Sequence, residues 1–222
     1  MLKTPLIIVN FKTYEQSIGN NALKLAKICE KVAKDTKANI AVAVQTADIY
    51  RISKEVFIPV LAQHIDNVDY GQFTGHTLAD SVKQAGAIGT LLNHSEHRLS
   101  LDIIKEIIKK NKNLEIVCCA PTSEISAEIA KFNPSFIAVE PPALIGGDIS
   151  VSTAQPELIT NTVNKVKQIA DIPVLCGAGV KTKQDVKIAI ELGAKGILLA
   201  SGVTKAKDPE KVLKELVNGL FQ

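Results

Sequence analysis

Residues 88–119, IGTLLNHSEHRLSLDIIKEIIKKNKNLEIVCC, contain the pattern that decides the fold. Two short apolar runs, Ile88–Leu92 and Ile116–Cys119, lie at its ends. They read as continuous hydrophobic segments, which are typical of strands buried on both faces in a parallel sheet. Between them, Ser100–Lys110 has charged residues on one helical face and apolar residues on the other, at Leu101, Ile103, Ile104, Ile107 and Ile108. The stretch therefore predicts a strand, a helix and a second strand.

This unit recurs from one end of the chain to the other. Eight apolar runs are expected as strands: Leu6–Phe11, Ile40–Val44, Val60–Ala62, Ile88–Leu92, Ile116–Cys119, Phe136–Val139, Pro173–Cys176 and Gly196–Ala200. Helical patterns lie at Asn21–Ala33, Asp48–Lys54, Leu78–Ala85, Ser100–Lys110, Ser123–Lys131, Pro156–Ile169, Asp185–Leu192 and Pro209–Leu220. No linker separates the units, so we expect an α/β fold in which residues 1–222 form a single (β/α)8 barrel domain. The alternative is a doubly wound open sheet, which normally has a glycine-rich turn after its first strand, where this chain reads NFKTYE.

Local signals mark several helix ends. Thr182 is placed to cap the helix that follows it, and Asp208 before Pro209 is an N-cap followed by proline at the first helical position. Gly86 and Gly193 follow predicted helix ends, where a residue in the left-handed conformation is favoured.

The composition is that of an ordinary globular protein, with 46% hydrophobic and 22% charged residues and no Trp. The net charge of +3 is too weak and too evenly spread to indicate a nucleic-acid partner. No apolar run approaches the roughly 18 residues of a membrane-spanning helix, and the N-terminal apolar stretch is too short for a signal peptide. We therefore expect a cytoplasmic protein without a membrane partner.

The four cysteines are Cys29, Cys118, Cys119 and Cys176. None forms a CxxC pair, and no histidine lies at zinc-finger spacing from them. This usage predicts buried free thiols in a reducing compartment, with no disulfide framework and no metal site.

The ends of the predicted strands carry unusual polar residues. Each has a plain interpretation by itself: Lys12 as a solvated cation, His94 as a loop histidine and Glu140 as a strand terminator. In a (β/α)8 barrel, however, the strand ends meet on one face, where the reactive groups lie. Short loops rich in glycine and serine on that face would expose backbone N–H groups, which suit a phosphate. The strand-end segments are Asn10–Lys12, Asn93–Glu96, Glu140–Pro142, Cys176–Gly179 and Ala200–Gly202.

The segments VNFK, LLNHSEHR, VEPPALIGG, CGAGV and LLASG resemble those of the triosephosphate isomerase family, in their order and spacing along nearly the whole chain. The stretch Ala62–Gly75 is similar to that family's third loop. The resemblance is to the short archaeal branch, and it implies a TIM barrel that interconverts glyceraldehyde 3-phosphate and dihydroxyacetone phosphate through an enediolate, in glycolysis and gluconeogenesis. Longer members usually carry a Trp in the loop after the glutamate, where this chain reads PPALIGG.

The resemblance also implies roles for individual residues. Glu140 would be the catalytic base, and His94 would act as a neutral electrophile next to a helix that starts near Ser95, whose positive end disfavours a second cation. Lys12 would stabilise the negative charge of the enediolate and help to hold the phosphate. Asn10 would orient the pocket. Ser95 and Glu96 would support the catalytic residues without touching the substrate, and Glu96 would pair with a basic side chain.

Backbone N–H groups would bind the phosphate of this small substrate, at the matching positions Ile145, Gly146, Gly179, Ala200 and Ser201. Pro141–Gly147 would be a hinged lid that excludes water when it closes. Because the reaction only moves protons, the resemblance implies neither a metal nor a redox cofactor.

Two other classes of function fit parts of this pattern. Other phosphate-binding barrel enzymes, such as phosphoribosylanthranilate isomerase and indole-glycerol-phosphate synthase, share the glycine-rich ends of the last two strands, and a non-catalytic barrel scaffold would share the fold alone. Lys12, His94 and Glu140 together favour the triose enzyme. The resemblance further implies a homo-oligomer, a tetramer with a dimer as the alternative. Its contacts would come from apolar helix positions such as Ile103, Ile107 and Ile129, which alternatively pack on the barrel.

Overall fold

The computed structural model describes residues 1–141 and 150–221. Eight parallel strands close into a barrel in chain order, with β1 paired to both β2 and β8. Leu6 lies opposite Asn39 on one side and Gly196 on the other. This closure confirms the predicted single-domain (β/α)8 barrel and excludes the open sheet. The strands are β1 (Leu6–Asn10), β2 (Asn39–Val44), β3 (Val60–Ala62), β4 (Gly89–Leu92), β5 (Glu115–Ala120), β6 (Phe136–Val139), β7 (Val174–Gly177) and β8 (Gly196–Leu199).

Burial on both faces explains why the strands read as unbroken apolar runs. In β1, Leu6 and Ile8 pack with residues of the other strands inside the barrel, whereas Ile7 and Val9 pack outward against the helices. All five residues of this strand are buried. A polar side chain at either kind of position would lose its hydration and would need a hydrogen-bond partner in exchange. The alternation of apolar and polar residues that marks a half-exposed strand is therefore absent.

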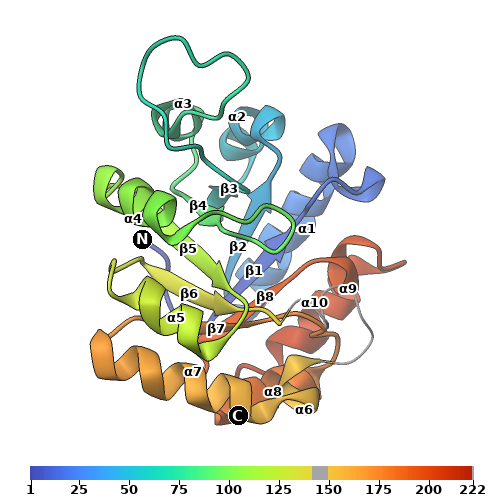
Figure 1. Cartoon of the computed structure of the whole chain (residues 1–222). Helices are drawn as coiled ribbons and strands as arrows, with labels where there is room; N and C mark the ends of the chain where they lie inside the picture. The colour runs from blue at the N-terminus through green and yellow to red at the C-terminus, as the bar shows by residue number, and fades with distance from the viewer. Residues whose placement is uncertain (142–149, 222) are drawn as a thin grey trace.

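Helices surround the barrel, as Figure 1 shows. The eight predicted helices are confirmed, with ends that differ by a few residues, and Thr182 and Asp208 cap α8 and α10 as predicted. Three further helices were not predicted because they are only three or four residues long, shorter than a periodic pattern requires. The helices are η1 (Glu15–Ser17), α1 (Gly19–Thr36), α2 (Thr46–Glu55), α3 (Ala79–Gln84), α4 (Leu101–Lys110), α5 (Ser123–Ala130), α6 (Val151–Ala154), α7 (Pro156–Ile169), α8 (Lys183–Glu191), α9 (Ser201–Thr204) and α10 (Pro209–Val217).

Two of the three apolar positions expected to be exposed on α4 and α5 are buried. Ile107 and Ile129 have no exposed surface, and only Ile103 remains accessible, at 38%. In α4, Ile104, Ile107 and Ile108 lie on one side of the helix and pack on the barrel, while Ile103 points away from it. For Ile107 and Ile129 the alternative prediction, that they pack on the barrel, is therefore confirmed, and they are not available for contacts between subunits.

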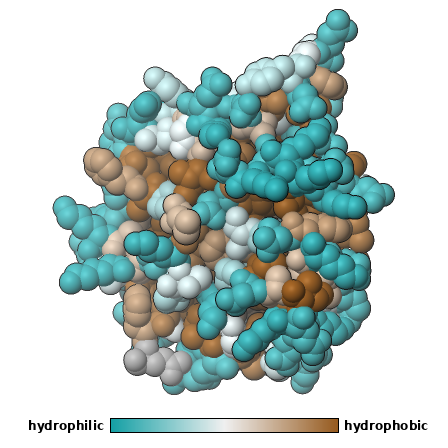
Figure 2. Space-filling model, turned by 90° about the vertical axis from the view of Figure 1, so that its left-hand side faces the viewer, coloured by the Kyte–Doolittle hydropathy of each residue, from teal (hydrophilic) through white to brown (hydrophobic). Residues whose placement is uncertain are grey.

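A long segment between β3 and α3, residues 63–78, projects from the top of the barrel in Figure 1. It carries two exposed aromatic side chains, Tyr70 and Phe73. On the face drawn in Figure 2, hydrophobic patches are interrupted by hydrophilic side chains. Within residues 1–141 and 150–221, no helix is long and apolar enough to cross a membrane.

Candidate active site

The predicted site residues meet in one hollow at the end of the barrel where the strands terminate. The hollow has a volume of about 490 Å³, counting its open mouth. Its lining contains the predicted residues Asn10, Lys12, His94, Glu140, Gly179, Ala200 and Ser201. The fold therefore brings together residues that are up to 191 positions apart in the sequence, since Asn10 lies on the first strand and Ser201 follows the last.

Glu140 follows β6 directly, and its backbone N–H donates to the Ala120 carbonyl at 2.8 Å, which fixes the strand end. The residue is only 3% exposed. Among the described residues, its Oε2 atom has no hydrogen-bond partner. Burial, followed by the neighbouring Glu140 charge, raises the pKa of the Cys119 thiol well above its ordinary value. A buried carboxylate oxygen without a partner is costly, and the residue that carries it lines the hollow.

Gly177, the last residue of β7, makes the room for this carboxylate. A Cβ atom at position 177 would lie 2.4 Å from Cγ of Glu140 and 2.9 Å from its Oε1. No side chain larger than hydrogen fits there without displacing Glu140. Gly177 was predicted only as part of a phosphate-binding turn, because a contact between two neighbouring strand ends leaves no local sequence signal.

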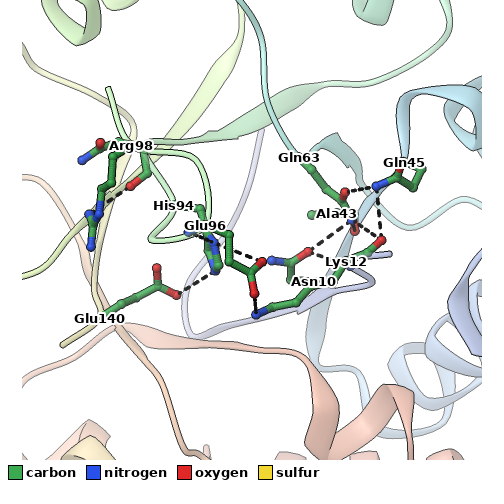
Figure 3. A network of polar contacts seen from close by, with 10 residues as sticks. Asn10, Lys12, Ala43, Gln45, Gln63, His94, Glu96, Arg98 and Glu140 are labelled. Carbon is green, nitrogen blue, oxygen red and sulfur yellow. Dashed lines mark hydrogen bonds and ion pairs between the residues drawn. The ribbon is translucent and has the colours of Figure 1, made fainter. Parts of the chain in front are cut away.

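His94 points its Nε2 atom toward Glu140 Oε1, at 3.8 Å, as Figure 3 shows. Its other ring nitrogen, Nδ1, accepts the backbone N–H of Glu96 at 3.2 Å. Because Nδ1 accepts a hydrogen here, the proton of a neutral ring lies on Nε2, which faces the hollow.

The predicted helix start near Ser95 is wrong. Residues 95–97 form a turn, in which the His97 N–H donates to the His94 carbonyl, and α4 begins only at Leu101 with Ser100 as its cap. Ser95 lies in this turn and lines neither of the hollows next to His94. The N–H of Glu96, rather than a helix end, is the group that orients the imidazole.

Lys12 reaches the hollow from a strained position directly after β1. Its φ angle is +50°, in the left-handed region that costs a side-chain-bearing residue about 1 kcal/mol or more. Asn10 Oδ1 accepts the Lys12 N–H at 3.0 Å, and the Lys12 carbonyl accepts from Gln63 at 3.0 Å and from Gln45 at 3.4 Å. These bonds, drawn in Figure 3, hold the backbone in this conformation.

The Lys12 ammonium pairs with Glu96 at 2.7 Å, as expected for a carboxylate that supports a basic side chain. The lysine side chain is only 10% exposed, whereas that of Glu96 is 59% exposed. The cation is therefore held in the wall of the hollow by a partner whose own charge is largely solvated.

The opposite wall is made by the ends of β7 and β8. Ala178 and Gly179 both have positive φ angles, 71° and 69°, which make a tight turn, and α9 begins at Ser201 directly after β8. The first N–H groups of a helix have no acceptor within it, so those near Ser201 are available to an anion. Ile145 and Gly146, the predicted donors of the lid, lie outside the described residues.

Sequence reasoning missed several residues of the site. Gln45 and Gln63 bond to the Lys12 carbonyl, and Tyr14 and Lys181 line the hollow. An amide that holds a distant carbonyl has no sequence signature, because its partner is set by the barrel and not by spacing along the chain.

Comparison with known proteins gives a consistent result. The family profile described as triosephosphate isomerase matches residues 5–219. A triosephosphate isomerase of Methanobacterium bryantii is 52% identical over 219 residues, covering 97% of both chains. That of Methanocaldococcus jannaschii is 50% identical over 215 residues, covering 96% of this chain and 98% of its own. That of Methanobrevibacter smithii is 46% identical over 222 residues, covering 99% and 100%.

Proposed function

The chain belongs to the triosephosphate isomerase family, whose members interconvert glyceraldehyde 3-phosphate and dihydroxyacetone phosphate, and we propose that Glu140, His94 and Lys12 carry out this reaction. The observation that supports these roles most strongly is the meeting of a buried Glu140 carboxylate, a His94 Nε2 atom and the Lys12 cation around one hollow. Other phosphate-binding barrel enzymes and a barrel without activity explain neither this meeting nor the family match.

The reaction moves one proton between neighbouring carbon atoms of the triose phosphate. The Glu140 carboxylate removes the proton from the carbon next to the carbonyl. The electron pair of that C–H bond forms the carbon–carbon double bond of the enediolate, and the π pair of the carbonyl moves onto its oxygen. The Nε2–H of His94 donates to that oxygen while the charge develops. His94 completes this donation by giving its Nε2 proton to that oxygen, and it regains a proton from the hydroxyl group on the adjacent carbon. The protonated Glu140 then returns its proton to the adjacent carbon, so one proton has moved between the carbons and one between the oxygens, with no net change.

Lys12 stabilises the enediolate by its charge. In a hollow that excludes water, a fixed cation lowers the energy of a developing oxyanion more than it lowers the energy of the neutral carbonyl. Glu96 keeps the ammonium in place when no substrate is bound. Asn10 contributes by accepting the Lys12 N–H and thereby orienting the lysine.

The substrate phosphate binds on the wall formed by Gly179, Ala200 and Ser201, where the turn after β7 and the start of α9 present backbone N–H groups. The family resemblance assigns further donors to Ile145 and Gly146 and a water-excluding lid to Pro141–Gly147, of which all but Pro141 lie outside the described residues. The enzyme acts in glycolysis and gluconeogenesis in the cytoplasm.

We test these roles with a coupled assay on glyceraldehyde 3-phosphate. The purified chain is expected to isomerise it, and Glu140→Ala is expected to lose the activity by a factor of about 10⁴ while its melting temperature stays near that of the wild type. A Glu140→Ala protein that retains most of the turnover would exclude Glu140 as the base.

The same chain assembles into a homo-oligomer, a tetramer or alternatively a dimer. Two features support assembly: the projecting segment 63–78 exposes Tyr70 and Phe73, and Ile103 is exposed on α4. Single exposed aromatic and aliphatic side chains on projecting elements are typical anchors of protein interfaces. Sedimentation equilibrium is expected to give a multiple of the 23.8 kDa chain mass, and a single-chain mass would contradict assembly.

A further inference from the structure

The rings of His64 and His97 stack on each other next to the catalytic hollow. Their centroids are 3.8 Å apart and their planes differ by 18°. His64 comes from the segment after β3 and His97 from the turn after β4. The stack therefore joins two chain segments that are separated by α3 and β4 in sequence.

Each of the two segments supports a residue proposed to be catalytic. Gln63, the residue before His64, donates to the Lys12 carbonyl, and the His97 N–H donates to the His94 carbonyl at 2.8 Å. Glu96, the residue before His97, both orients His94 and pairs with Lys12. The stack therefore connects the segment that supports Lys12 with the segment that supports His94.

His64 also connects to the projecting segment. Its Nε2 atom lies 3.3 Å from Asp66 Oδ1, while Asp66 Oδ2 accepts the Thr77 N–H at 2.6 Å. The Asp66 N–H in turn donates to the Thr77 carbonyl at 2.9 Å. Asp66 therefore closes the base of the segment and holds the His64 ring.

The two rings lie in a setting with several charges. His64 and His97 border a second hollow beside the catalytic one, and the side chains around it include Lys12, Asp66, His76, His94 and Glu96. Of these, Asp66 contacts His64 directly. Among the described residues, no three His, Cys, Asp or Glu side chains lie close enough together to hold a metal ion, so the two histidines are not part of a metal site there. The protonation state of the two rings can therefore affect the stack directly.

Two stacked imidazolium rings repel each other, whereas a neutral ring stacks on either a neutral or a charged one. Burial lowers the pKa of His64, and a charge on His97 lowers it further, against the opposing effect of Asp66. A histidine whose folded pKa is depressed binds fewer protons than in the unfolded chain, so its contribution to stability is lost as the pH falls.

We propose that the His64–His97 stack is a pH-sensitive positioning pair for the isomerase reaction: it holds Lys12 and His94 in place while at most one ring is charged, and it separates when both are protonated. The inference rests on the proposed roles of Lys12 and His94. Neither stacked residue touches the substrate, so both act through the residues that they position.

The charge coupling is tested first by NMR titration of the histidine ring C2–H resonances, which needs no turnover. In the wild type, His64 is expected to titrate below the ordinary histidine value of about 6.5. In His97→Phe, which keeps an aromatic ring but no charge, His64 is expected to titrate in one step at higher pH. A His64 titration that His97→Phe leaves unchanged would overturn the proposal.

The consequence for catalysis is tested by the pH profile of kcat/KM. At about pH 8, His97→Phe is expected to lie within about twofold of the wild type, and at about pH 5.5 it is expected to retain an activity fraction about threefold larger. His97→Ala, which removes the stack, is expected to lose about tenfold in kcat/KM over the whole range. Lys131→Gln is the control, because it removes a surface charge at the end of α5 away from the stack, and its profile is expected to follow the wild type.

Superimposable profiles of wild type and His97→Phe, or an equal shift in Lys131→Gln, would overturn the positioning role. His97→Gln replaces His97→Phe if the phenylalanine variant does not fold. If instead the proposed roles of Lys12 and His94 were wrong, His97→Phe would still change the His64 titration, but Lys12→Ala would not change the turnover. The two failures are therefore distinguishable.

Discussion

Replacing Gly177 by alanine moves the catalytic carboxylate without removing any of its atoms. The new Cβ would lie 2.4 Å from Cγ of Glu140, whereas ordinary contacts begin at 3.4 Å, so the carboxylate must move by about 1 Å. A displacement of this size costs roughly a hundredfold in rate, or about 2.7 kcal/mol of activation free energy. Phosphate affinity should stay within about twofold, because the donors near Ser201 are unaffected.

The assay for Gly177→Ala measures kcat by coupled turnover and the dissociation constant of a phosphorylated two-carbon acid by fluorescence or calorimetry. Gly219→Ala is the matched control. Its Cβ would lie 2.5 Å from the Lys183 carbonyl oxygen, an equally severe clash, but at the end of α10. We expect this control to lose stability by about 1–3 kcal/mol with little change in kcat. Wild-type kcat in Gly177→Ala would refute the argument that Glu140 is held in place by a tight fit.

Three further results follow from the structure. Lys12→Ala should weaken binding of the phosphorylated acid by at least about tenfold, measured by calorimetry, and unchanged affinity would contradict the proposed role of Lys12. Glu96→Gln, which loses the charge that pairs with Lys12 but keeps the N–H donated to His94, should lower kcat/KM less than Lys12→Ala does; a larger loss would show that the Lys12–Glu96 pair is not the main role of Glu96. Burial raises the pKa of the Cys29 thiol to about 12, so unfolded thiols ionise first and stability should fall as the pH rises above about 9, by up to about 1.4 kcal/mol per pH unit for each such thiol; Cys29→Ala should flatten that fall in urea titrations, and an unchanged slope would speak against it.

The barrel was predictable because burial on both faces leaves its mark on the sequence. The unbroken apolar run at 6–9, for example, reflects residues that pack inward and outward in turn. Chain order then left few ways to arrange eight such units.

The turn after β4 shows where local signals mislead. A helix start was expected near Ser95, but the apolar periodicity begins only after Ser100, which caps α4. His94 is therefore oriented by the Glu96 N–H, a bond that depends on the fold of the turn and not on a helix.

Contacts between neighbouring strand ends lay beyond the sequence. The fit of Gly177 against Glu140 and the bonds of Gln45 and Gln63 to the Lys12 carbonyl join residues from different strands. A glycine in a turn or a glutamine in a loop has many common uses, so only the assembled barrel distinguishes these.

The central claim is that Glu140 is the proton-transferring base, and the most direct measurement is the turnover of Glu140→Asp. The shorter side chain keeps the carboxylate but withdraws it from the substrate carbon. We predict a fall in kcat of about a thousandfold, with affinity for the phosphorylated acid within about twofold of the wild type. Turnover close to that of the wild type would contradict the assignment.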